Sequence, residues 1–278
     1  MKTISKDQIA NFNTNGVIFL SNYFTEDWLQ LLKTGIEKNI LNLGKEKRIW
    51  SKENTGQFTF YDSDNGRRIK EYKNFVEESP MKNIAGKLLN TTKVNFFFDA
   101  ISVRSPGVQF STPWHQDEPY WSVEGFDTVS IWMPLVDVRK GSALSFVPGS
   151  HRWGKNFKQQ DFGALNPENQ KDVNNVSFDD QWEITADIDA DRKKYKVVSW
   201  EMKAGDCVAF NARTLHGGGG NLLPNKDLKV FNTQWLGDDV KVCFKDSGMD
   251  PDHSEKMRAA GMKSGDELDG ELYPAFNM

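Results

Sequence analysis

The chain has 278 residues, of which 38% are hydrophobic, and a formal net charge of −4. This length allows one large domain or two small ones, with a core that needs no disulfide support. The absence of a basic block argues against a nucleic-acid-binding protein, and no apolar run is long enough to span a bilayer. The isolated Cys207 and Cys243, with an N-terminus that lacks a signal-peptide region, favour a cytoplasmic protein.

The N-terminal part, residues 1–90, is predicted to be helical. Ser5 is a suitable N-cap for a first helix that ends at Gly16. A second helix is expected after Thr25, because the apolar residues that follow recur at helical spacing. The segment "MKNIAGKLLN" predicts a third, shorter helix.

The hydrophobic pattern changes from residue 94 onward. Short segments rich in β-branched and aromatic residues are bounded by Gly, Pro, Asn or Asp, which is typical of β-strands. These segments are residues 93–104, 128–138, 143–150, 195–202, 206–212 and 228–237. Strands that follow a helical start predict an α+β protein, mainly β in its core, with the strands in a sandwich or barrel.

The whole chain is predicted to form a single domain with its β core in residues 94–240. Residues 154–194 are polar and poor in strand signals, so we expect an insertion that acts as a lid. Residues 241–278 form a charged tail, with one short helix expected around "SEKMRAAGM".

The segment "TPWHQDEPYW" contains a histidine and an acid two residues apart, His115 and Asp117. On an extended strand both side chains lie on one face, and Gln116 points the other way. A His-x-Asp pair by itself is more often a surface pair than a metal site. Its position among aromatic residues in a strand region strengthens the case for a metal site but leaves the surface pair open as the alternative.

A third ligand has to come from elsewhere, and the chain has only three other histidines. His253 lies in the charged tail and is expected to be solvated, and His151 is expected to form hydrogen bonds in a turn. His216 ends a predicted strand and precedes "GGGGN", where glycines permit a close approach of the backbone. Two histidines and one carboxylate are the ligand set of non-haem iron(II) oxygenases, which leaves coordination positions open.

Six segments make the chain similar to the phytanoyl-CoA dioxygenase family of iron(II)- and 2-oxoglutarate-dependent oxygenases. In family order they are "PWHQDEPYW", "SIWMPLVDV", "GSALSFVPGSHRW", "AGDCVAF", "LHGGGGN" and "QWLGDDV". The resemblance implies a double-stranded β-helix (a jelly-roll, cupin-like barrel) with the N-terminal helices packed outside it. It implies Fe(II) bound by His115, Asp117 and His216, with Trp132 lining the 2-oxoglutarate pocket. The implied reaction uses O2 to hydroxylate a small molecule, and the retained carboxylate ligand favours hydroxylation over halogenation.

One position departs from the family pattern. The family usually holds the far carboxylate of 2-oxoglutarate with an arginine early in the strand after the second histidine, and that position falls near Leu228 or Lys229. No arginine occurs there, so we expect Lys229 to substitute, ahead of Lys226, with Arg104 as the alternative from an earlier strand. Gly218 stands where some members have a serine.

The aromatic residues around the His-x-Asp motif are candidates for substrate contacts. Tyr120 and Trp121 are expected to line a substrate pocket, although packing at the barrel rim explains these two equally well, and for Trp114 rim packing is the better explanation. Two alternatives remain beside the hydroxylase. One is a non-catalytic jelly-roll protein that binds a small molecule, and the other is an Fe(II) oxygenase that does not use 2-oxoglutarate.

Overall fold

The computed structural model describes residues 2–51, 56–108, 111–159, 182–246, 248–268 and 270–278. Five α-helices lie in these ranges: α1 (Lys6–Asn15), α2 (Glu26–Leu41), α3 (Lys70–Glu78), α4 (Met81–Leu89) and α5 (Ser254–Ala259). Three short 3-10 helices are η1 (Glu118–Tyr120), η2 (Lys140–Ser142) and η3 (Ser150–Arg152). Among the described residues, no helix combines the length and the apolar character needed to cross a membrane.

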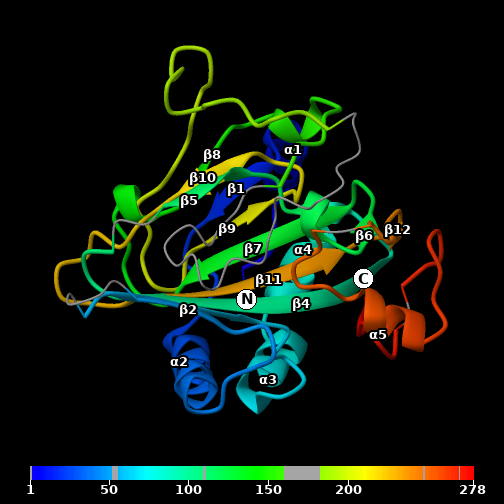
Figure 1. Ribbon diagram of the computed structural model, residues 1–278, viewed down its shortest axis with the longest axis horizontal. Helices are drawn as coiled ribbons and strands as arrows, with labels where there is room; N and C mark the ends of the chain where they lie inside the picture. The colour runs from blue at the N-terminus through cyan, green and yellow to red at the C-terminus, as the bar shows by residue number, and fades with distance from the viewer. Residues whose placement is uncertain (1, 52–55, 109–110, 160–181, 247, 269) are drawn as a thin grey trace.

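Most strands belong to one large antiparallel sheet. Its order is β1 (Val17–Leu20), β9 (Cys207–Phe210), β7 (Thr128–Pro134), β11 (Leu228–Leu236), β4 (Lys93–Arg104), β3 (Phe58–Ser63) and β2 (Arg48–Ser51), and β13 (Ala275–Asn277) also pairs with β4. A smaller sheet has the order β5 (Thr112–His115), β10 (His216–Gly218) and β8 (Ser145–Phe146). β6 (Val123–Glu124) pairs with β12 (Lys241–Val242). The small sheet lies on one side of the large sheet, and α2 and α3 lie on the other (Figure 1).

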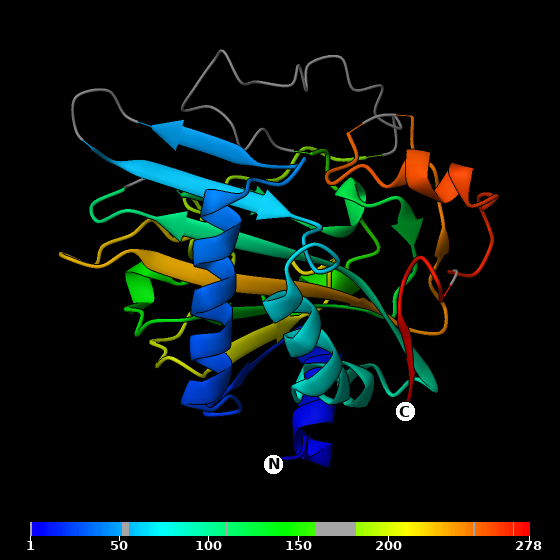
Figure 2. The ribbon, with the colours of Figure 1, turned by 90° about the horizontal axis from the view of Figure 1, so that it is seen from below.

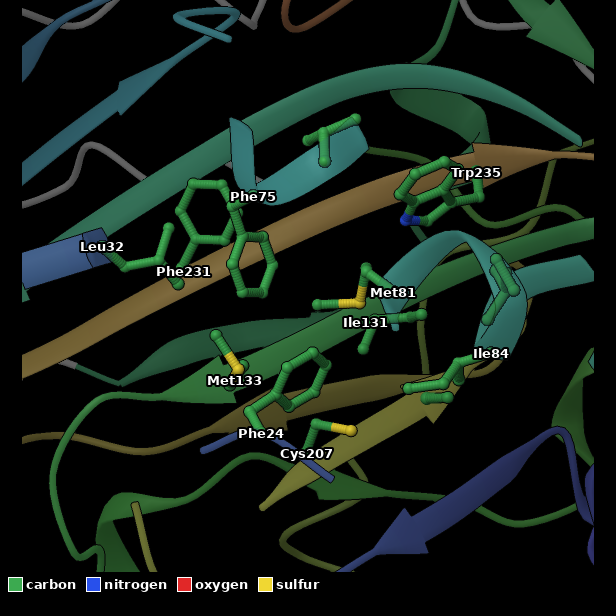
Figure 3. Close-up of a cluster of buried hydrophobic side chains, with 14 of the residues drawn as sticks. Phe24, Leu32, Phe75, Met81, Ile84, Ile131, Met133, Cys207, Phe231 and Trp235 are labelled. Atoms are coloured by element: carbon green, nitrogen blue, oxygen red, sulfur yellow. The ribbon is translucent and has the colours of Figure 1, made fainter. Parts of the chain in front are cut away.

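The main core lies between the large sheet and these helices. Side chains from α2, α3 and α4 pack with the outward-facing side chains of β4, β7, β9 and β11. Figure 3 shows members of this cluster, including Leu32 and Phe75 from the helices and Ile131, Phe231 and Trp235 from the strands. The helices therefore cover one face of the sheet, as Figure 2 shows from below, and the opposite face is left for the small sheet.

Several expected elements are confirmed. Ser5 caps α1 through a capping box with Gln8, and Gly16 ends it in a left-handed conformation. α2 begins after Thr25, α4 covers the third expected helix and α5 the short helix of the tail. β4 and β11 occupy almost the whole of the segments expected for them.

The prediction of a helical N-terminal part is wrong in one respect. β1, β2 and β3 lie among the first 90 residues, and all three join the large sheet. α3 was also not predicted. Short strands of this kind depend on hydrogen bonds from a neighbouring strand, so local sequence patterns indicate them poorly. The segment 195–202 contributes only isolated bridges, Phe146 with Val198 and Val138 with Met202.

Candidate metal centre and its cavity

A cavity of about 200 Å³ lies between the large sheet and the small sheet. Its walls come from β3, β4, β7 and β11 on one side and from β5, β10 and the segment around η1 on the other. His115, Asp117 and His216 line this cavity together with Arg104. A concave, partly apolar hollow that contains titratable groups has the general form of an active site.

The three predicted ligands converge in this cavity. The Nε2 atoms of His115 and His216 each lie 3.3 Å from Oδ1 of Asp117. The three candidate ligand atoms lie within 4.8 Å of one another, and they form the one such cluster of three among the described residues. One ion can therefore contact all three side chains.

The local backbone differs from the one expected. His115 is the last residue of β5 and pairs with His216, which begins β10 instead of ending β9. Asp117 is not on the strand, because its backbone is helical (φ −77°, ψ −44°) and it directly precedes η1. The amide of Asp117 donates to Ala212 O at 2.8 Å, which holds this turn against the loop before β10.

Hydrogen bonds select which atom of each ligand is left for a metal. Nδ1 of His115 lies 2.8 Å from Pro113 O, and Nδ1 of His216 lies 3.0 Å from Thr214 O. A proton on each Nδ1 donates to that carbonyl and leaves the Nε2 lone pair free for coordination. Ser130 Oγ donates to Oδ2 of Asp117 at 2.7 Å, which leaves Oδ1 between the two rings.

The protonation states also suit metal binding. Burial, together with the neighbouring His216 ring, lowers the pKa of His115, which favours the neutral imidazole. Burial acts to raise the pKa of Asp117, but the positive charge that the neighbouring histidines carry when protonated outweighs burial and holds that pKa well below its ordinary value, so Asp117 is ionised. A neutral histidine and an ionised carboxylate are the ligating forms of these side chains.

The glycines after His216 permit a close approach of the backbone, as the sequence indicated. A Cβ on Gly217 would lie 3.0 Å from the carbonyl oxygens of Thr112 and Pro113, so β10 can approach β5 this closely only with glycine. Gly219 has a φ of +80°, a conformation that favours glycine. This close approach brings the two histidine-bearing strands together.

Gln116 points away from the cavity, as predicted, and contacts the start of the 154–194 insertion. Its Nε2 donates to Lys155 O at 3.1 Å and to Arg213 O at 2.9 Å, and its Oε1 accepts from the amide of Phe157 at 3.0 Å. The turn from His115 to Asp117, called the metal-binding turn below, is therefore joined by hydrogen bonds to the described start of the insertion. Residues 160–181 lie outside the described residues, and the lid stays a prediction.

Of the three cations considered for the 2-oxoglutarate carboxylate, Arg104 is the one that lines the cavity. It lies on β4, its Nη1 donates to Gly219 O, and its Nη2 donates to Thr112 Oγ1 at 3.0 Å. Its Nε is buried and has no hydrogen-bond partner among the residues that the structure describes. Burial lowers its pKa to about 10, and among the described residues no carboxylate forms an ion pair with it. A desolvated guanidinium of this kind is suited to bind an anion.

The two lysines expected to hold 2-oxoglutarate are not brought to the cavity. Val230 lines it, so strand alternation places the side chain of its neighbour Lys229 on the opposite face of β11. Lys226 is exposed in the turn before β11. The expected role of Lys229 would require the opposite face of β11 to line the cavity, and a shift of one residue in register exchanges the two faces of a strand.

The aromatic candidates divide into two groups. Trp132 on β7, Tyr120 and Trp121 are buried and line the cavity. Tyr120 meets the His115 ring edge-on, with 5.9 Å between the ring centroids. Trp114 does not line the cavity, and its Nε1 donates to Asp189 Oδ2 at 3.0 Å near the end of the insertion.

The other two histidines take no part in the cluster of ligand atoms. His151 lies in η3 with its Nε2 3.2 Å from Asn13 O, which agrees with the expected hydrogen bond in a turn. The expectation that His253 is solvated is wrong, because this residue is only 2% exposed. It packs among Phe97, Phe98 and Tyr273, because the tail folds back onto β4.

Sequence reasoning missed several polar residues in the cavity. Thr59, Asn232 and Gln234 line it, and each has a buried side-chain oxygen that finds no hydrogen-bond partner within the described ranges. Arg48 and Asp250 also line it as an ion pair. For Asn232 and Gln234 the signal was their alternation with apolar residues along β11, whereas no local pattern relates Arg48 to Asp250.

Two imidazole nitrogens and one carboxylate oxygen fit Fe(II), the metal of oxygenases with this donor set. All three donors are oriented by hydrogen bonds before a metal is present. Oriented donors in a cavity with unpartnered polar atoms fit a metal that also binds a co-substrate. The residues present therefore fit the group that the sequence implied.

A family model for phytanoyl-CoA dioxygenase (PhyH) matches residues 12–224. No curated protein matched the chain. Among solved structures, it is similar to the non-heme alpha-ketoglutarate-dependent carbocyclase SnoK of nogalamycin biosynthesis, with 20% identity over 98% of this chain and 96% of SnoK and a TM-score of 0.73.

Two further structures give the same fold. EvdO2 from Micromonospora carbonacea var. aurantiaca, solved with 2-oxoglutarate, has 18% identity over 89% of this chain and 96% of EvdO2, with a TM-score of 0.62. EctD from S. alaskensis, solved with 2-oxoglutarate and 5-hydroxyectoine, has 16% identity over 84% of this chain and 76% of EctD, with a TM-score of 0.62. The match of the family model over most of the chain shows that this protein belongs to the phytanoyl-CoA dioxygenase family.

Proposed function

We propose that this protein is a non-haem Fe(II)- and 2-oxoglutarate-dependent dioxygenase that hydroxylates a small molecule. One observation carries this proposal: the oriented ligand atoms of His115, Asp117 and His216 share a cavity with a buried guanidinium, Arg104, that has no acidic partner in the part of the chain that the structure describes. The first feature fits the metal, and the second fits the dianionic co-substrate. Membership of the family supports both assignments.

His115 and His216 would bind the metal through Nε2 and Asp117 through Oδ1. Three protein donors leave further positions of a six-coordinate ion for the co-substrate and O2. When bound, Fe(II) with 2-oxoglutarate and O2 supplies oxidative decarboxylation to succinate and CO2 together with oxidation of a substrate C–H bond. Ser130 holds Asp117 in its ligating orientation, and the buried Tyr120 and Trp121 limit access of water from their side of the cavity.

Arg104 would bind the far carboxylate of 2-oxoglutarate. Leu228, near the family's arginine position, is the direct cross-strand partner of Arg104, so the two side chains lie on one face of the sheet at one level. Thr59 is the partner of Arg104 on its other side, and its unpartnered Oγ1 supplies a second group for the carboxylate. The Arg104 guanidinium would thus lie near the place of the family's arginine, although Arg104 is on β4 and the family's position is on β11. Trp132, paired with Asn232, would form the wall of the same pocket.

The strand order supports a double-stranded β-helix. Consecutive core strands alternate between the two sheets: β4, β7, β9 and β11 belong to the large one, and β5, β8 and β10 to the small one. A single domain is supported by the likeness to SnoK, which extends over nearly the whole of both chains. We keep the lid function of residues 154–194 as part of the proposal, since Gln116 connects the start of that segment with the metal-binding turn.

The experiment is a turnover assay with anaerobically loaded protein. Succinate release from 2-oxoglutarate is measured against pools of small metabolites with Fe(II) and a reductant, beside the same protein loaded with Zn(II). We expect succinate release from the Fe(II)-loaded protein, no release from the Zn(II)-loaded protein, and no release from Asp117→Ala. Equal turnover with Zn(II) would contradict an oxygenase.

Visible absorption of the iron–keto acid chelate measures co-substrate binding without turnover. Its formation in the unmodified protein is expected, and its loss in His216→Ala should follow loss of the metal. If iron binds but no chelate forms, the protein is an Fe(II) oxygenase that does not use 2-oxoglutarate. If neither binds, the non-catalytic jelly-roll protein is the correct alternative.

A further inference from the structure

A second pair of charges lines the cavity of the metal centre. Arg48 comes from β2 and Asp250 from the segment that follows β12. Nη2 of Arg48 lies 2.6 Å from Oδ1 of Asp250, and Nη1 donates to Oδ2, so the pair is bidentate. Each side chain keeps about a quarter of its surface exposed, which leaves it accessible to a molecule in the cavity.

The pair joins two distant walls of the cavity. The Arg48 guanidinium lies over the Tyr61 ring, 5.7 Å from its centroid, and Tyr61 belongs to β3 of the large sheet. The amide of Asp250 donates to Tyr120 O at 2.7 Å, beside the metal-binding turn. The ion pair therefore spans the cavity from the outer strands of the large sheet to the segment that carries the aromatic wall.

The charges in the cavity cancel once the metal and co-substrate are added. Among the described residues that line the cavity, the charged side chains are those of Arg48, Arg104, Asp117 and Asp250. The two histidines are counted as uncharged because they would bind the metal. Fe(II) with the Asp117 carboxylate leaves one positive charge, and the 2-oxoglutarate dianion with Arg104 leaves one negative charge. Arg48 and Asp250 neutralise each other. A substrate with a net charge would be desolvated without a counter-charge, which is costly.

We propose that the Arg48–Asp250 pair is the substrate-recognition element of this cavity and that it selects small molecules without net charge. The inference rests on the proposed function, because the charge balance includes Fe(II) and 2-oxoglutarate. Arg48 keeps N–H groups that Asp250 does not use, and the Asp250 carboxylate keeps lone pairs, so polar groups of both kinds find partners. Tyr120 and Trp121 supply the wall for the apolar part of the substrate.

The test uses four probes that share a phenyl ring and differ in charge. Phenylacetamide is uncharged, phenylalanine is a zwitterion, phenylacetate is an anion and phenethylamine is a cation. Binding to the protein loaded anaerobically with Fe(II) and saturating 2-oxoglutarate is measured by ligand-observed NMR. We expect the two net-neutral probes to bind at least about tenfold more tightly than the two charged ones. Equal or tighter binding of a charged probe, or no binding of either neutral one, would overturn the inference.

Single substitutions should change this preference in opposite directions. Asp250→Asn leaves Arg48 unpaired, so phenylacetate binding should strengthen about ten- to a hundredfold, the range of a charge-assisted hydrogen bond. Arg48→Gln leaves Asp250 unpaired and should favour phenethylamine in the same way. The exchanged pair, Arg48→Asp with Asp250→Arg, restores neutrality and should restore the original selection even if the single variants fold poorly.

The chelate absorption separates the two proposals. If the unmodified protein forms no iron–2-oxoglutarate chelate, the proposed function fails. If the chelate forms in every variant but probe selection does not follow the charge of the pair, the proposed function stands and the assignment of Arg48 and Asp250 is wrong.

Discussion

At the scale of single residues, the proposed metal centre depends on hydrogen bonds that leave one candidate ligand atom of each side chain free. The histidines donate through Nδ1 to carbonyls two residues earlier in the chain, so the backbone that carries each ring also orients it. Asp117 has no such local partner and relies on Ser130 from β7. The carboxylate is therefore the ligand whose orientation is most open to change by a single substitution.

Ser130→Ala should weaken metal binding about ten- to a hundredfold, because hydrogen bonds that orient metal ligands have effects of this size. Titration of the protein with Fe(II) under anaerobic conditions gives the affinity. The matched control is Ser102→Ala, because Ser102 on β4 also lines the cavity; this substitution should leave metal binding nearly unchanged. Equal affinities in Ser130→Ala and the unmodified protein would show that Asp117 needs no such support.

Arg104→Met should weaken 2-oxoglutarate binding by about ten- to a hundredfold, since a charge-assisted hydrogen bond contributes roughly 1.5–3 kcal/mol. Iron binding should stay nearly intact. The matched control is Lys229→Met, because Lys229 lies on the other face of β11 and its loss should have little effect. A loss of binding in Lys229→Met alone would restore the anchor expected from the sequence.

At the scale of elements, the C-terminal tail is part of the site. Lys245 extends under η1 and donates to the carbonyls of Glu118 at 3.0 Å, Trp121 and Val123 at 3.2 Å. Burial lowers the pKa of this lysine, as expected for an ammonium group taken out of water. The tail thereby holds the segment that begins at Asp117.

Lys245→Met should lower the free energy of unfolding by roughly 1.5–3 kcal/mol, because three carbonyls lose a charged donor. Metal affinity should fall as well, since η1 directly follows Asp117. Thermal unfolding and Fe(II) titration measure the two effects. Lys241→Met removes only a surface ion pair with Glu267 and should change stability by less than about 1 kcal/mol. Similar effects of both substitutions would contradict a special role for Lys245.

His253 should make stability depend on pH. Burial lowers its pKa in the folded protein to about 3, whereas in the unfolded chain it keeps its ordinary value of 6.5. The unfolded state therefore binds the extra proton between these values, and the free energy of unfolding should fall as pH falls from 6.5 toward 3. The slope approaches about 1.4 kcal/mol per pH unit within this window. Denaturant unfolding across it should show a smaller slope in His253→Gln, and identical slopes would exclude this cause.

At the scale of the whole molecule, the large sheet separates two environments. Helices cover one face and build the main core, and the opposite face meets the small sheet around the cavity. His115 and His216 come from β5 and β10 of the small sheet, and Ser130 comes from the large sheet. A metal at this position connects parts of the fold that are far apart in the chain.

Binding of Fe(II) and 2-oxoglutarate should therefore raise the thermal unfolding midpoint. A ligand at a hundred times its dissociation constant stabilises the folded state by about 2.7 kcal/mol, which corresponds to several degrees for a chain of this size. Differential scanning fluorimetry under anaerobic conditions measures the shift. His216→Ala should remove it, and an unchanged midpoint in the unmodified protein would contradict binding at a preformed site.

Local sequence patterns determined much of this protein. Ser5 and Gly16 mark the ends of α1, and the residues of β4 and β11 read as strands because their side chains suit a pleated, buried surface. The His-x-Asp spacing and the glycines after His216 indicated all three ligand atoms that converge. These features are readable because their physical cause lies within a few neighbouring residues.

Only the tertiary structure decided the rest. Arg104 lies beside Leu228, near the position of the missing arginine, because β4 pairs with β11 in one register, and a register one residue away would have favoured Lys229. Arg48 meets Asp250 across 202 positions of the chain, and His253 is buried because the tail folds onto β4. Charge pairing and burial depend on which distant segments become neighbours, and that is fixed by packing of the whole chain.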